Sequence, residues 1–306
     1  MSDMIIGSSF AMLSMFKALC RAANYDKSVL LLGETGTGKD LAARKIHELS
    51  SRRDYPFIPI NCSNLSDGLF ESELFGHARG AFTGAVQEKS GLLDAAGNGT
   101  VFMDEIGELP LHLQAKILRV LDKKESRRIG STLTTTVRVR FIFATNRDLH
   151  GDVHKGTFRK DLYYRINVVR ILIPALRERK EDIPVLADHF IGRENLRSGT
   201  RKYLDPEAMQ KLLHYDFPGN VRELENIIER SAVFSEGDAI TAKDIRLDTD
   251  PNRASDEVVG SQLKAILEEC RWNKTKTARK LGKSRRQLYR LLDKYDLTEC
   301  AKKFMI

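Results

Sequence analysis

Short apolar runs alternate with amphipathic stretches along the first half of the chain. Four runs bounded by turn or charged residues are predicted to be buried strands, at residues 28–32, 57–61, 101–104 and 139–144. Helical periodicity marks the segments 39–50, 70–75 and 111–121. Because strands separated by helices form a parallel sheet covered on both faces, we expect residues 1–172 to be an α/β domain.

The apolar pattern becomes helical after Pro174. Amphipathic helices are predicted at residues 183–194, 206–215 and 221–235, with no convincing strand between them. The pair Asp205-Pro206 is a good helix start, with Asp205 as the cap. Residues 173–246 are therefore expected to form a small helical subdomain.

A polar stretch that contains Pro251 separates this body from the end of the chain. We interpret residues 247–257 as a linker. The remaining segment is expected to be an all-α domain, residues 258–306, with helices at 258–270, 274–281 and 284–294.

Composition places the chain among globular proteins, with 42% hydrophobic and 30% charged residues in a length of 306. No apolar run approaches the roughly 18 residues that a membrane helix needs, and the first residues do not resemble a secretory signal. Four scattered cysteines argue against a disulfide framework or a zinc site, and Cys20 and Cys62 are expected in the core. We therefore expect a cytoplasmic protein without membrane insertion.

Positive charge is concentrated at the end of the chain. Residues 251–306 contain 14 Lys and Arg against 7 Asp and Glu, which accounts for nearly all of the net charge of +8. A basic tail behind a near-neutral body favours a nucleic-acid-binding module. Charge alone is equally consistent with a solvated basic face.

A glycine-rich segment, Gly-Glu-Thr-Gly-Thr-Gly-Lys-Asp at residues 33–40, follows one predicted strand and opens a predicted helix. Such a loop turns its backbone N–H groups around phosphates at a helix N-terminus, and Lys39 would reach the β and γ phosphates. Asp40 stands where Ser or Thr usually contacts magnesium. The alternative is a glycine-rich turn that happens to precede a lysine. The predicted nucleotide-binding residues are Gly33, Glu34, Thr35, Gly36, Thr37, Gly38, Lys39, Asp40 and Leu41.

Polar residues end two further predicted strands. Asp104 would help to hold magnesium, directly or through water, and Glu105 would polarise the attacking water. Thr145 and Asn146 would face the γ-phosphate or the water, because ligands bind at the carboxyl ends of parallel strands. Each feature alone is compatible with ordinary capping of a strand end. Together with the glycine-rich loop they favour ATP hydrolysis.

Arg159 and Arg165 lie six positions apart in the segment 158–165. Arginine stabilises the charge that develops on a transferred phosphoryl group, so these residues could serve the nucleotide of a neighbouring subunit in a ring. Surface salt bridges are the alternative, and spacing does not separate the two.

Residues 80–85 read Gly-Ala-Phe-Thr-Gly-Ala, the signature of sigma-54-dependent activators, also called bacterial enhancer-binding proteins. The chain resembles this family over nearly its whole length. Further motifs that carry the resemblance lie at residues 71–77, 104–110, 144–149, 174–179 and 217–224. Phe217 and Ala175 replace a usual tryptophan and a usual proline, with small consequences.

The resemblance implies an AAA+ P-loop ATPase that assembles as a hexameric ring, with a parallel sheet and a helical lid. In the family an acidic residue at the position of Asp40 is common. The implied roles are ATP binding by Lys39 and its neighbours, Walker B for Asp104 and Glu105, coupling to nucleotide state for Asn61, first sensor for Thr145 and Asn146, trans-acting fingers for Arg159 and Arg165, second sensor for Arg222, and an adenine pocket near Ile6.

The signature segment suits a mobile projection, because glycines and small residues permit tight turns and Phe82 places an apolar group at the tip. In the family this loop contacts sigma-54 when ATP is bound and withdraws on hydrolysis. A plain hairpin with a packed phenylalanine is the alternative. The predicted contact residues are Gly80, Ala81, Phe82, Thr83, Gly84 and Ala85.

The basic tail has the pattern of a helix-turn-helix, with Gly282 at the turn and Ser284 as a cap. It resembles the Fis-type domain of these activators, which acts as a dimer on paired half-sites. A basic packing domain is the alternative. The residues available to DNA are Lys283, Ser284, Arg285, Arg286, Gln287, Tyr289, Arg290 and Lys294.

The ATPase motifs begin almost at Met1, so either a separate regulatory protein controls the chain or a regulatory domain is missing. The favoured function is ATP-driven remodelling of sigma-54 RNA polymerase holoenzyme by a homo-oligomer bound to enhancer DNA, with magnesium as cofactor. A repressor on the same scaffold and a different AAA+ machine are the rivals. Neither rival accounts for the signature at residues 80–85.

Overall fold

The computed structural model describes residues 4–63, 67–82, 85, 87–247, 267 and 277. The chain divides into two compact units, Met1–Ile245 and Arg246–Ile306. The predicted linker and the predicted helices of the tail lie almost wholly outside the described residues, so the fold described below is that of the first unit.

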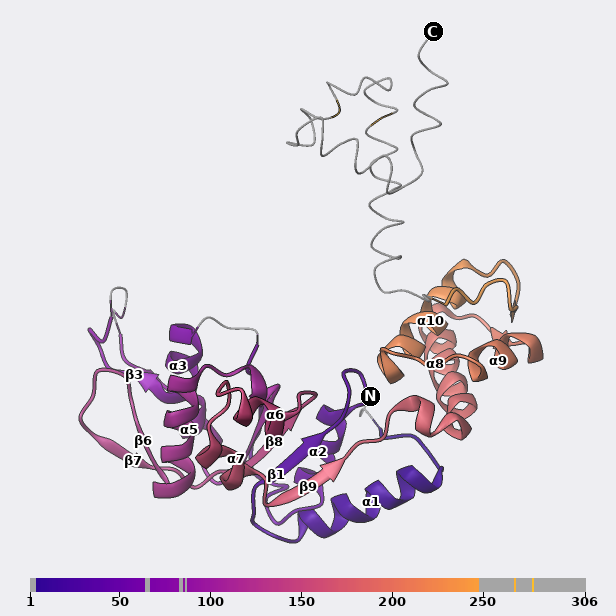
Figure 1. The fold of residues 1–306 in the computed structure, drawn as a ribbon. Helices are drawn as coiled ribbons and strands as arrows, with labels where there is room; N and C mark the ends of the chain where they lie inside the picture. The colour runs from indigo at the N-terminus through magenta and orange to yellow at the C-terminus, as the bar shows by residue number, and fades with distance from the viewer. Residues whose placement is uncertain are drawn as a thin grey trace. The chain divides into compact units, whose positions relative to one another are not determined.

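A five-stranded parallel sheet organises the first unit (Figure 1). Its strand order is β2-β5-β8-β1-β9. The strands are β1 (Val29–Leu32), β2 (Phe57–Asn61), β5 (Thr100–Asp104), β8 (Arg140–Thr145) and β9 (Val169–Leu172). The four predicted strands are confirmed to within one residue at either end. Strand β9 was not predicted, because at this edge of the sheet only Ile171 is buried and the alternation is too short to be distinctive.

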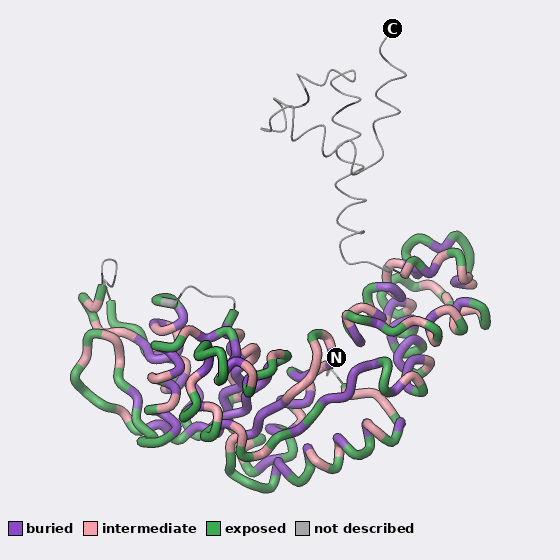
Figure 2. The backbone as a smooth tube through the Cα atoms, viewed as in Figure 1, coloured by how far each residue is buried: buried purple, intermediate pink, exposed green. Residues whose placement is uncertain are grey.

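Alternate residues of the central strands face opposite sides of the sheet, as the two-residue repeat of a strand requires. Phe143 and Met103 belong to one apolar core, whereas Ile142 and Phe102 belong to the other. Both faces of the sheet are therefore buried (Figure 2), which explains why the strands are continuous apolar runs.

Helices cover each face. The core that contains Phe143 also receives side chains from α3 (Asp67–Phe75), α4 (Leu92–Ala96), α5 (Leu111–Lys123) and α7 (Lys160–Ile166). The opposite core is built with α1 (Phe10–Ala23) and α2 (Lys39–Glu48). A short helix, α6 (Leu149–His154), follows β8, and the 3-10 turn η1 (Ile106–Glu108) follows β5.

Helix α1 was not predicted, and it corrects one expectation about the cysteines. Met12, Met15 and Leu19 are buried, whereas Cys20, one position further on, is exposed on the outer side of the helix. Cys62 is buried as expected. The alternating three- and four-residue spacing of the apolar positions decides which side chains of α1 face the sheet, and Cys20 is out of phase with it.

Two antiparallel hairpins extend the α/β part. One pairs β3 (Gly76–His77) with β4 (Lys89–Ser90), and the other pairs β6 (Glu125–Arg127) with β7 (Thr134–Thr136). Backbone hydrogen bonds also connect the two hairpins to each other. Ala78 N donates to Ile129 O at 2.9 Å, and Ile129 N donates to Gly76 O at 3.0 Å. These bonds join the two hairpins into one extension of the α/β part, called the arm below (β3, β4, β6 and β7). The signature segment lies in the arm, between β3 and β4.

Three helices, α8 (Ile183–Ser198), α9 (Pro206–Leu213) and α10 (Asn220–Phe234), form the helical part, after the short turns η2 (Leu176–Glu178) and η3 (Lys180–Asp182). Asp205 caps α9 as predicted, with its side chain accepting from Ala208 N at 2.6 Å. The expectation of no strand here was wrong: β10 (Tyr203–Leu204) pairs in parallel with β11 (Ala239–Ile240). Two-residue strands are too short to leave a pattern in the sequence. Within the part of the chain that the structure describes, no helix has the length and apolarity to span a membrane.

The buried centre of β8 gives a direct test of the fold. Phe143 is fully buried and its ring lies 5.7 Å from that of Phe141. Replacing Phe143 with alanine should lower the free energy of unfolding by about 3–5 kcal/mol, because a large side chain is lost from a closely packed core. Urea unfolding would measure the difference. Leu133→Ala is the control, since Leu133 is 78% exposed, and equal losses in the two variants would contradict the buried position of Phe143.

Candidate functional site

The register of the parallel sheet gathers the predicted site residues at one edge. Asn61 of β2 pairs with Asp104 of β5, and Leu32 of β1 pairs with Thr145 of β8. The next residue, Gly33, donates its N–H to Thr145 O at 3.4 Å and begins the glycine-rich loop. Four chain segments that are far apart in the sequence therefore end side by side, where parallel sheets bind ligands.

The glycine-rich loop needs glycine at two positions. Gly36 and Gly38 have φ angles of +79° and +93°, which side chains disfavour. At Gly36 a Cβ would also lie only 2.2 Å from Gly219 O in the helical part. The loop leads directly into the N-terminus of α2, so its N–H groups and the helix dipole can act on the same anion.

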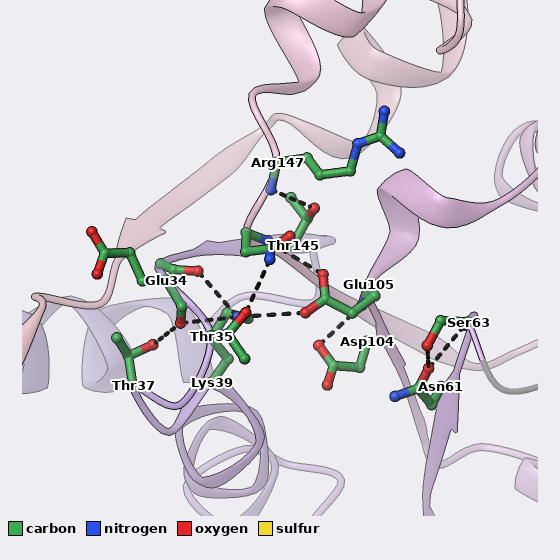
Figure 3. Close-up of polar contacts among 12 residues, drawn as sticks. Glu34, Thr35, Thr37, Lys39, Asn61, Ser63, Asp104, Glu105, Thr145 and Arg147 are labelled. Carbon is green, nitrogen blue, oxygen red and sulfur yellow. Dashed lines mark hydrogen bonds and ion pairs between the residues drawn. The ribbon is translucent and has the colours of Figure 1, made fainter. Parts of the chain in front are cut away.

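Lys39 is almost fully buried beneath this loop. Its Nζ donates to Gly33 O at 3.0 Å and to Glu34 O at 3.2 Å, and lies 3.8 Å from Glu105 Oε1 (Figure 3). Thr37 Oγ1 also donates to Glu34 O, at 2.8 Å. The ammonium group is thus held inside the loop, next to the carboxylate predicted to polarise water.

Glu105 has an unusual backbone for its residue type, with φ +53° and ψ +48° in the left-handed region. Such strain persists where the surrounding structure fixes it and is frequent at functional sites. The strained turn directs the carboxylate towards the loop and the end of β8. There Oε2 accepts from Asn146 N at 3.4 Å. Asp104 lies beside it, and burial raises the pKa of the Asp104 carboxyl while the charge of Lys39 opposes the rise.

Asn146 and Thr145 have different surroundings. Asn146 Nδ2 donates to Thr35 Oγ1 at 3.0 Å, so this side chain faces the glycine-rich loop as predicted for a sensor. Thr145 is completely buried, and its Oγ1 accepts from Arg147 N at 3.1 Å. That contact caps the end of β8, so the structure brings only Asn146 to the loop by a side-chain bond.

Asn61 lies beside Asp104 in the register, but its side chain bonds elsewhere. Asn61 Oδ1 accepts from Ser63 N at 2.8 Å and from Ser63 Oγ at 2.7 Å (Figure 3). Glu105 instead faces Lys39. The coupling of Asn61 to Glu105 therefore stays a prediction about another state of the site.

A cavity of about 260 Å³ continues from the glycine-rich loop. Its polar side contains Gly36, Asp40 and Arg222, and its apolar side contains Ile6 and Met15. The cavity thus joins three predicted features: the phosphate loop, the adenine-proximal segment and the second sensor. An apolar pocket with a few convergent polar groups is the usual form of a small-ligand site.

Asp182 fixes the adenine-proximal segment, a role that sequence reasoning missed. This fully buried carboxylate accepts from Ser8 N at 2.7 Å, Ser9 N at 2.9 Å and Ser9 Oγ at 2.7 Å. The segment that includes Ile6 is therefore anchored to the residue before α8. An aspartate just before the predicted helix 183–194 was the only signal available in the sequence.

Glu34 forms the second missed contact, with Arg177 of η2. Arg177 Nη1 and Nη2 donate to the two carboxylate oxygens at 2.8 and 2.5 Å. The bond from Arg177, followed by one from Asn220, lowers the pKa of Glu34 to about 2. Because the pKa is lowered, the pair stabilises the fold above about pH 4.5, the ordinary value, and is lost only as pH falls towards 2.

Arg159 and Arg165 have partners away from the glycine-rich loop. Arg159 pairs with Asp161 at 2.6 Å, and Arg165 pairs with Asp122 at 3.0 Å and donates to Leu121 O at 2.9 Å. Their side chains are 40% and 48% exposed. The structure therefore places both guanidinium groups at the surface of the α/β part.

Among the residues that the structure describes, no group of three or more His, Cys, Asp or Glu could form a metal site by itself. Magnesium in nucleotide sites usually takes one or two carboxylates and completes its shell with phosphate and water. Asp104, close to Lys39 and at the strand end, can supply the carboxylate that such a magnesium site needs.

Comparison with known proteins agrees with this geometry. The model of the family "Sigma-54 interaction domain" matches residues 5–172, "AAA+ ATPase lid domain" matches 177–262, and "Bacterial regulatory protein, Fis family" matches 261–295. The chain belongs to the sigma-54-dependent transcription activators.

Relatives of this activator include the transcriptional regulatory protein ZraR of Salmonella typhimurium, 44% identical over 93% of the chain and 67% of ZraR. The Nif-specific regulatory protein of Azotobacter vinelandii is 44% identical over 94% of the chain and 58% of its own length. The chain thus spans about three fifths to two thirds of these relatives. The crystal structure of NtrX from Brucella abortus in complex with ATP has a TM-score of 0.75 and 31% identity, and covers 96% of the chain and 69% of NtrX.

Backbone hydrogen bonds connect residues within the signature segment of the activator, at the end of the arm. Gly80 N donates to Ala85 O at 2.8 Å, and Ala85 N donates to Phe82 O at 3.0 Å. Phe82 is 47% exposed, and its ring lies 5.0 Å from that of His77. Thr83 and Gly84 lie outside the described residues, as do the predicted DNA contacts from Lys283 to Lys294.

The geometry of the site predicts that different substitutions will affect nucleotide binding and ATP hydrolysis separately. Lys39→Ala should abolish ATP binding, because the cation within the loop is lost. Glu105→Gln should keep binding but slow hydrolysis by about 100-fold or more, the usual contribution of a positioned general base. Fluorescent-nucleotide titration and phosphate release would measure the two. Lys45→Ala, on the exposed side of α2, is the control; unchanged ATP affinity in Lys39→Ala would refute the loop assignment.

Proposed function

We propose that this chain hydrolyses ATP to remodel sigma-54 RNA polymerase holoenzyme at promoters, while bound to enhancer DNA. The observation that carries the proposal is the convergence of Lys39, Glu105 and Asn146 on the glycine-rich loop, in a domain whose separate arm carries the signature segment. The ATP complex of the similar NtrX structure supports nucleotide binding in the same fold.

The reaction is attack of water on the γ-phosphorus of ATP, which gives ADP and phosphate. Glu105 orients the water and polarises it by accepting a hydrogen bond from its O–H group. Lys39 and the loop N–H groups stabilise the charge on the phosphate oxygens. Asn146 is placed to contact the γ-phosphate or the water from the end of β8. Arg222 and Ile6 line the cavity, where they would contact the bound nucleotide.

Magnesium is the expected cofactor. Asp104 would hold the ion directly or through water, with nucleotide phosphates supplying further ligands. The ion would neutralise phosphate charge. Asp40, in the first turn of α2, would take the place of the usual hydroxyl residue near this position.

Catalysis is completed in trans within a hexameric ring. Arg159 and Arg165 are exposed and engage acidic neighbours that they can exchange for a phosphate group. Arginine suits this role because its planar guanidinium stays charged and binds phosphate oxygens with two donors. ATP hydrolysis would then depend on contacts between subunits.

The arm would convert hydrolysis into work on the polymerase. Residues Gly80 to Ala85 would contact sigma-54 in the ATP state and withdraw after hydrolysis. The half-exposed Phe82 supplies apolar surface that a partner would bury. A contact that exists in only one nucleotide state transmits free energy to the partner through differential binding.

The basic tail would recognise enhancer DNA. The Fis-family match at residues 261–295 and the excess of Lys and Arg after residue 250 support this role. Lys283, Arg285, Arg286 and Arg290 are among the side chains that would reach bases or phosphates, in a dimer on paired half-sites.

The decisive measurement is ATP-dependent open-complex formation by sigma-54 polymerase on a sigma-54 promoter. We expect the parent protein to open the promoter and Thr83→Ala to fail while still hydrolysing ATP, because the change lies in the contact loop and not at the nucleotide. Active polymerase and ATPase controls are required. Failure of the parent to open the promoter would favour a repressor or another AAA+ machine.

The trans action of Arg165 can be tested by mixing subunits. Arg165→Ala and Glu105→Gln should each lose hydrolysis alone, because each removes one half of a shared site. Mixed rings should regain part of the activity, since a Glu105→Gln subunit supplies Arg165 to the intact Glu105 of its neighbour. Phosphate release across mixing ratios measures this, and no recovery at any ratio would contradict the assignment.

A further inference from the structure

Asn220 is the first residue of α10 and lies where the helical part meets the glycine-rich loop. The residue is fully buried, and its φ of +55° is a left-handed value that asparagine tolerates better than most residues. Neither the chemistry of ATP hydrolysis nor the sequence motifs assigned a role to this side chain.

Both ends of the Asn220 amide are bonded across the interface. Oδ1 accepts from Leu176 N at 2.8 Å, and Nδ2 donates to Thr35 O and to Glu34 Oε2, each at 3.1 Å. A single buried side chain thus joins α10, the turn η2 and the glycine-rich loop. A buried amide with its hydrogen bonds made fixes geometry, because any displacement leaves a polar group unsatisfied.

The main chain reinforces this junction. Val221 N and Arg222 N both donate to Gly36 O, at 3.0 and 3.3 Å. The absence of a side chain at Gly36 lets Gly219 O approach closely. The N-terminus of α10 is therefore seated directly on the loop that would hold the phosphates.

The path continues from the loop to the predicted catalytic carboxylate. Thr35, whose carbonyl is held by Asn220, accepts with its hydroxyl from Asn146 Nδ2 at 3.0 Å. Asn146 N in turn donates to Glu105 Oε2 at 3.4 Å. Five residues thus form one continuous path of hydrogen bonds, which runs from Leu176 N through Asn220, Thr35 and Asn146 to Glu105.

We propose that Asn220 is a positioning residue for ATP hydrolysis, which aligns Thr35, and through Thr35 the Asn146–Glu105 pair, when the helical part is seated on the loop. This inference rests on the proposed ATPase function. Asn220 itself need not touch the nucleotide. Its effect is to make the alignment of the water-polarising group depend on the position of α10.

The expected effect falls on turnover more than on nucleotide affinity. The loop retains Lys39 and its N–H groups without Asn220, so the nucleotide still binds. The alignment of Glu105 and Asn146 is weakened, and displacements of the order of 1 Å at reacting groups lower rates by about 100-fold. A defect in the fold alone would not separate kcat from affinity in this way.

Asn220→Gly is the first variant, because glycine accepts the left-handed backbone and removes only the side chain. We expect kcat for ATP hydrolysis to fall about tenfold or more, the equivalent of one lost hydrogen bond to an aligned group, with the Kd for ADP changed by less than about threefold. Asn220→Asp is the second variant. It keeps size and the acceptor for Leu176 N but replaces the donor to Glu34 and Thr35, and kcat should fall at least as far.

Asn195→Asp is the matched control. Asn195 lies in α8 and bonds only within the helical part, with Nδ2 donating to Lys202 O at 2.8 Å and Oδ1 accepting from Lys202 N. This change disturbs the helical part by the same chemistry but does not reach the loop. Parental kcat in Asn195→Asp supports the proposal, and an equal loss there would overturn it.

A double-mutant cycle tests the path through Thr35. Thr35→Val removes the hydroxyl that accepts from Asn146, while Thr35→Ser retains it. If both residues act along one path, the kcat of Asn220→Gly with Thr35→Val should lie within about threefold of the slower single variant, whereas independent sites would multiply their losses. Multiplied losses, or parental kcat in either Asn220 variant, would overturn the inference.

Failure of the role of Asn220 and failure of the proposed ATPase function give different results. An active parent with fully active Asn220 variants removes the role of Asn220 and leaves the ATPase intact. A parent that binds but never hydrolyses ATP, in any oligomeric state, removes the proposed function and the inference with it.

Discussion

The parallel register of the central sheet is the constraint on which the rest of the site depends. Because Asn61 stands opposite Asp104, and Leu32 opposite Thr145, the ends of β2, β5, β8 and β1 fall at one level. A shift of one residue in any strand would turn its terminal side chain to the other face of the sheet. The apolar residues of both cores fix that register, so the packing of Phe143 and Ile142 on opposite faces also sets where Glu105 and Asn146 stand.

Residues with strong local signals were predictable from the sequence. The glycine-rich loop, the acidic end of β5 and the cap at Asp205 each combine a residue type with a position next to a predicted strand or helix, and that combination made them recognisable. The three inner strands, β5, β8 and β1, were found because burial on both faces makes them apolar throughout, and the edge strand β2 was found as a short apolar run although only its Ile60 is buried. Two elements were missed because they lack such a signal. Helix α1 lies before the alternation of strands and helices begins, and strand β9 is half exposed at the edge of the sheet.

Contacts between distant residues could not be predicted. Glu34 was recognised as part of the loop, but its pairing with Arg177 joins residues more than a hundred positions apart. The same holds for Asp182, which anchors Ser8 and Ser9, and for Asn220. Each of these side chains is polar and bonds to main-chain groups or to another loop, so no periodicity in the sequence marks its partner. The sequence therefore locates the chemistry, whereas only the fold shows how the helical part is joined to it.

The seam between the loop and α10 combines two kinds of force with different dependence on conditions. A Cβ at position 36 would lie 2.2 Å from Gly219 O, so steric exclusion allows only glycine at this position of the seam. Excluded volume scarcely changes with temperature, salt or pH, whereas the hydrogen bonds of Asn220 compete with water and weaken as conditions become harsher. Harsher conditions should consequently loosen this seam by weakening the hydrogen bonds of Asn220, whereas the steric requirement for glycine at position 36 stays the same.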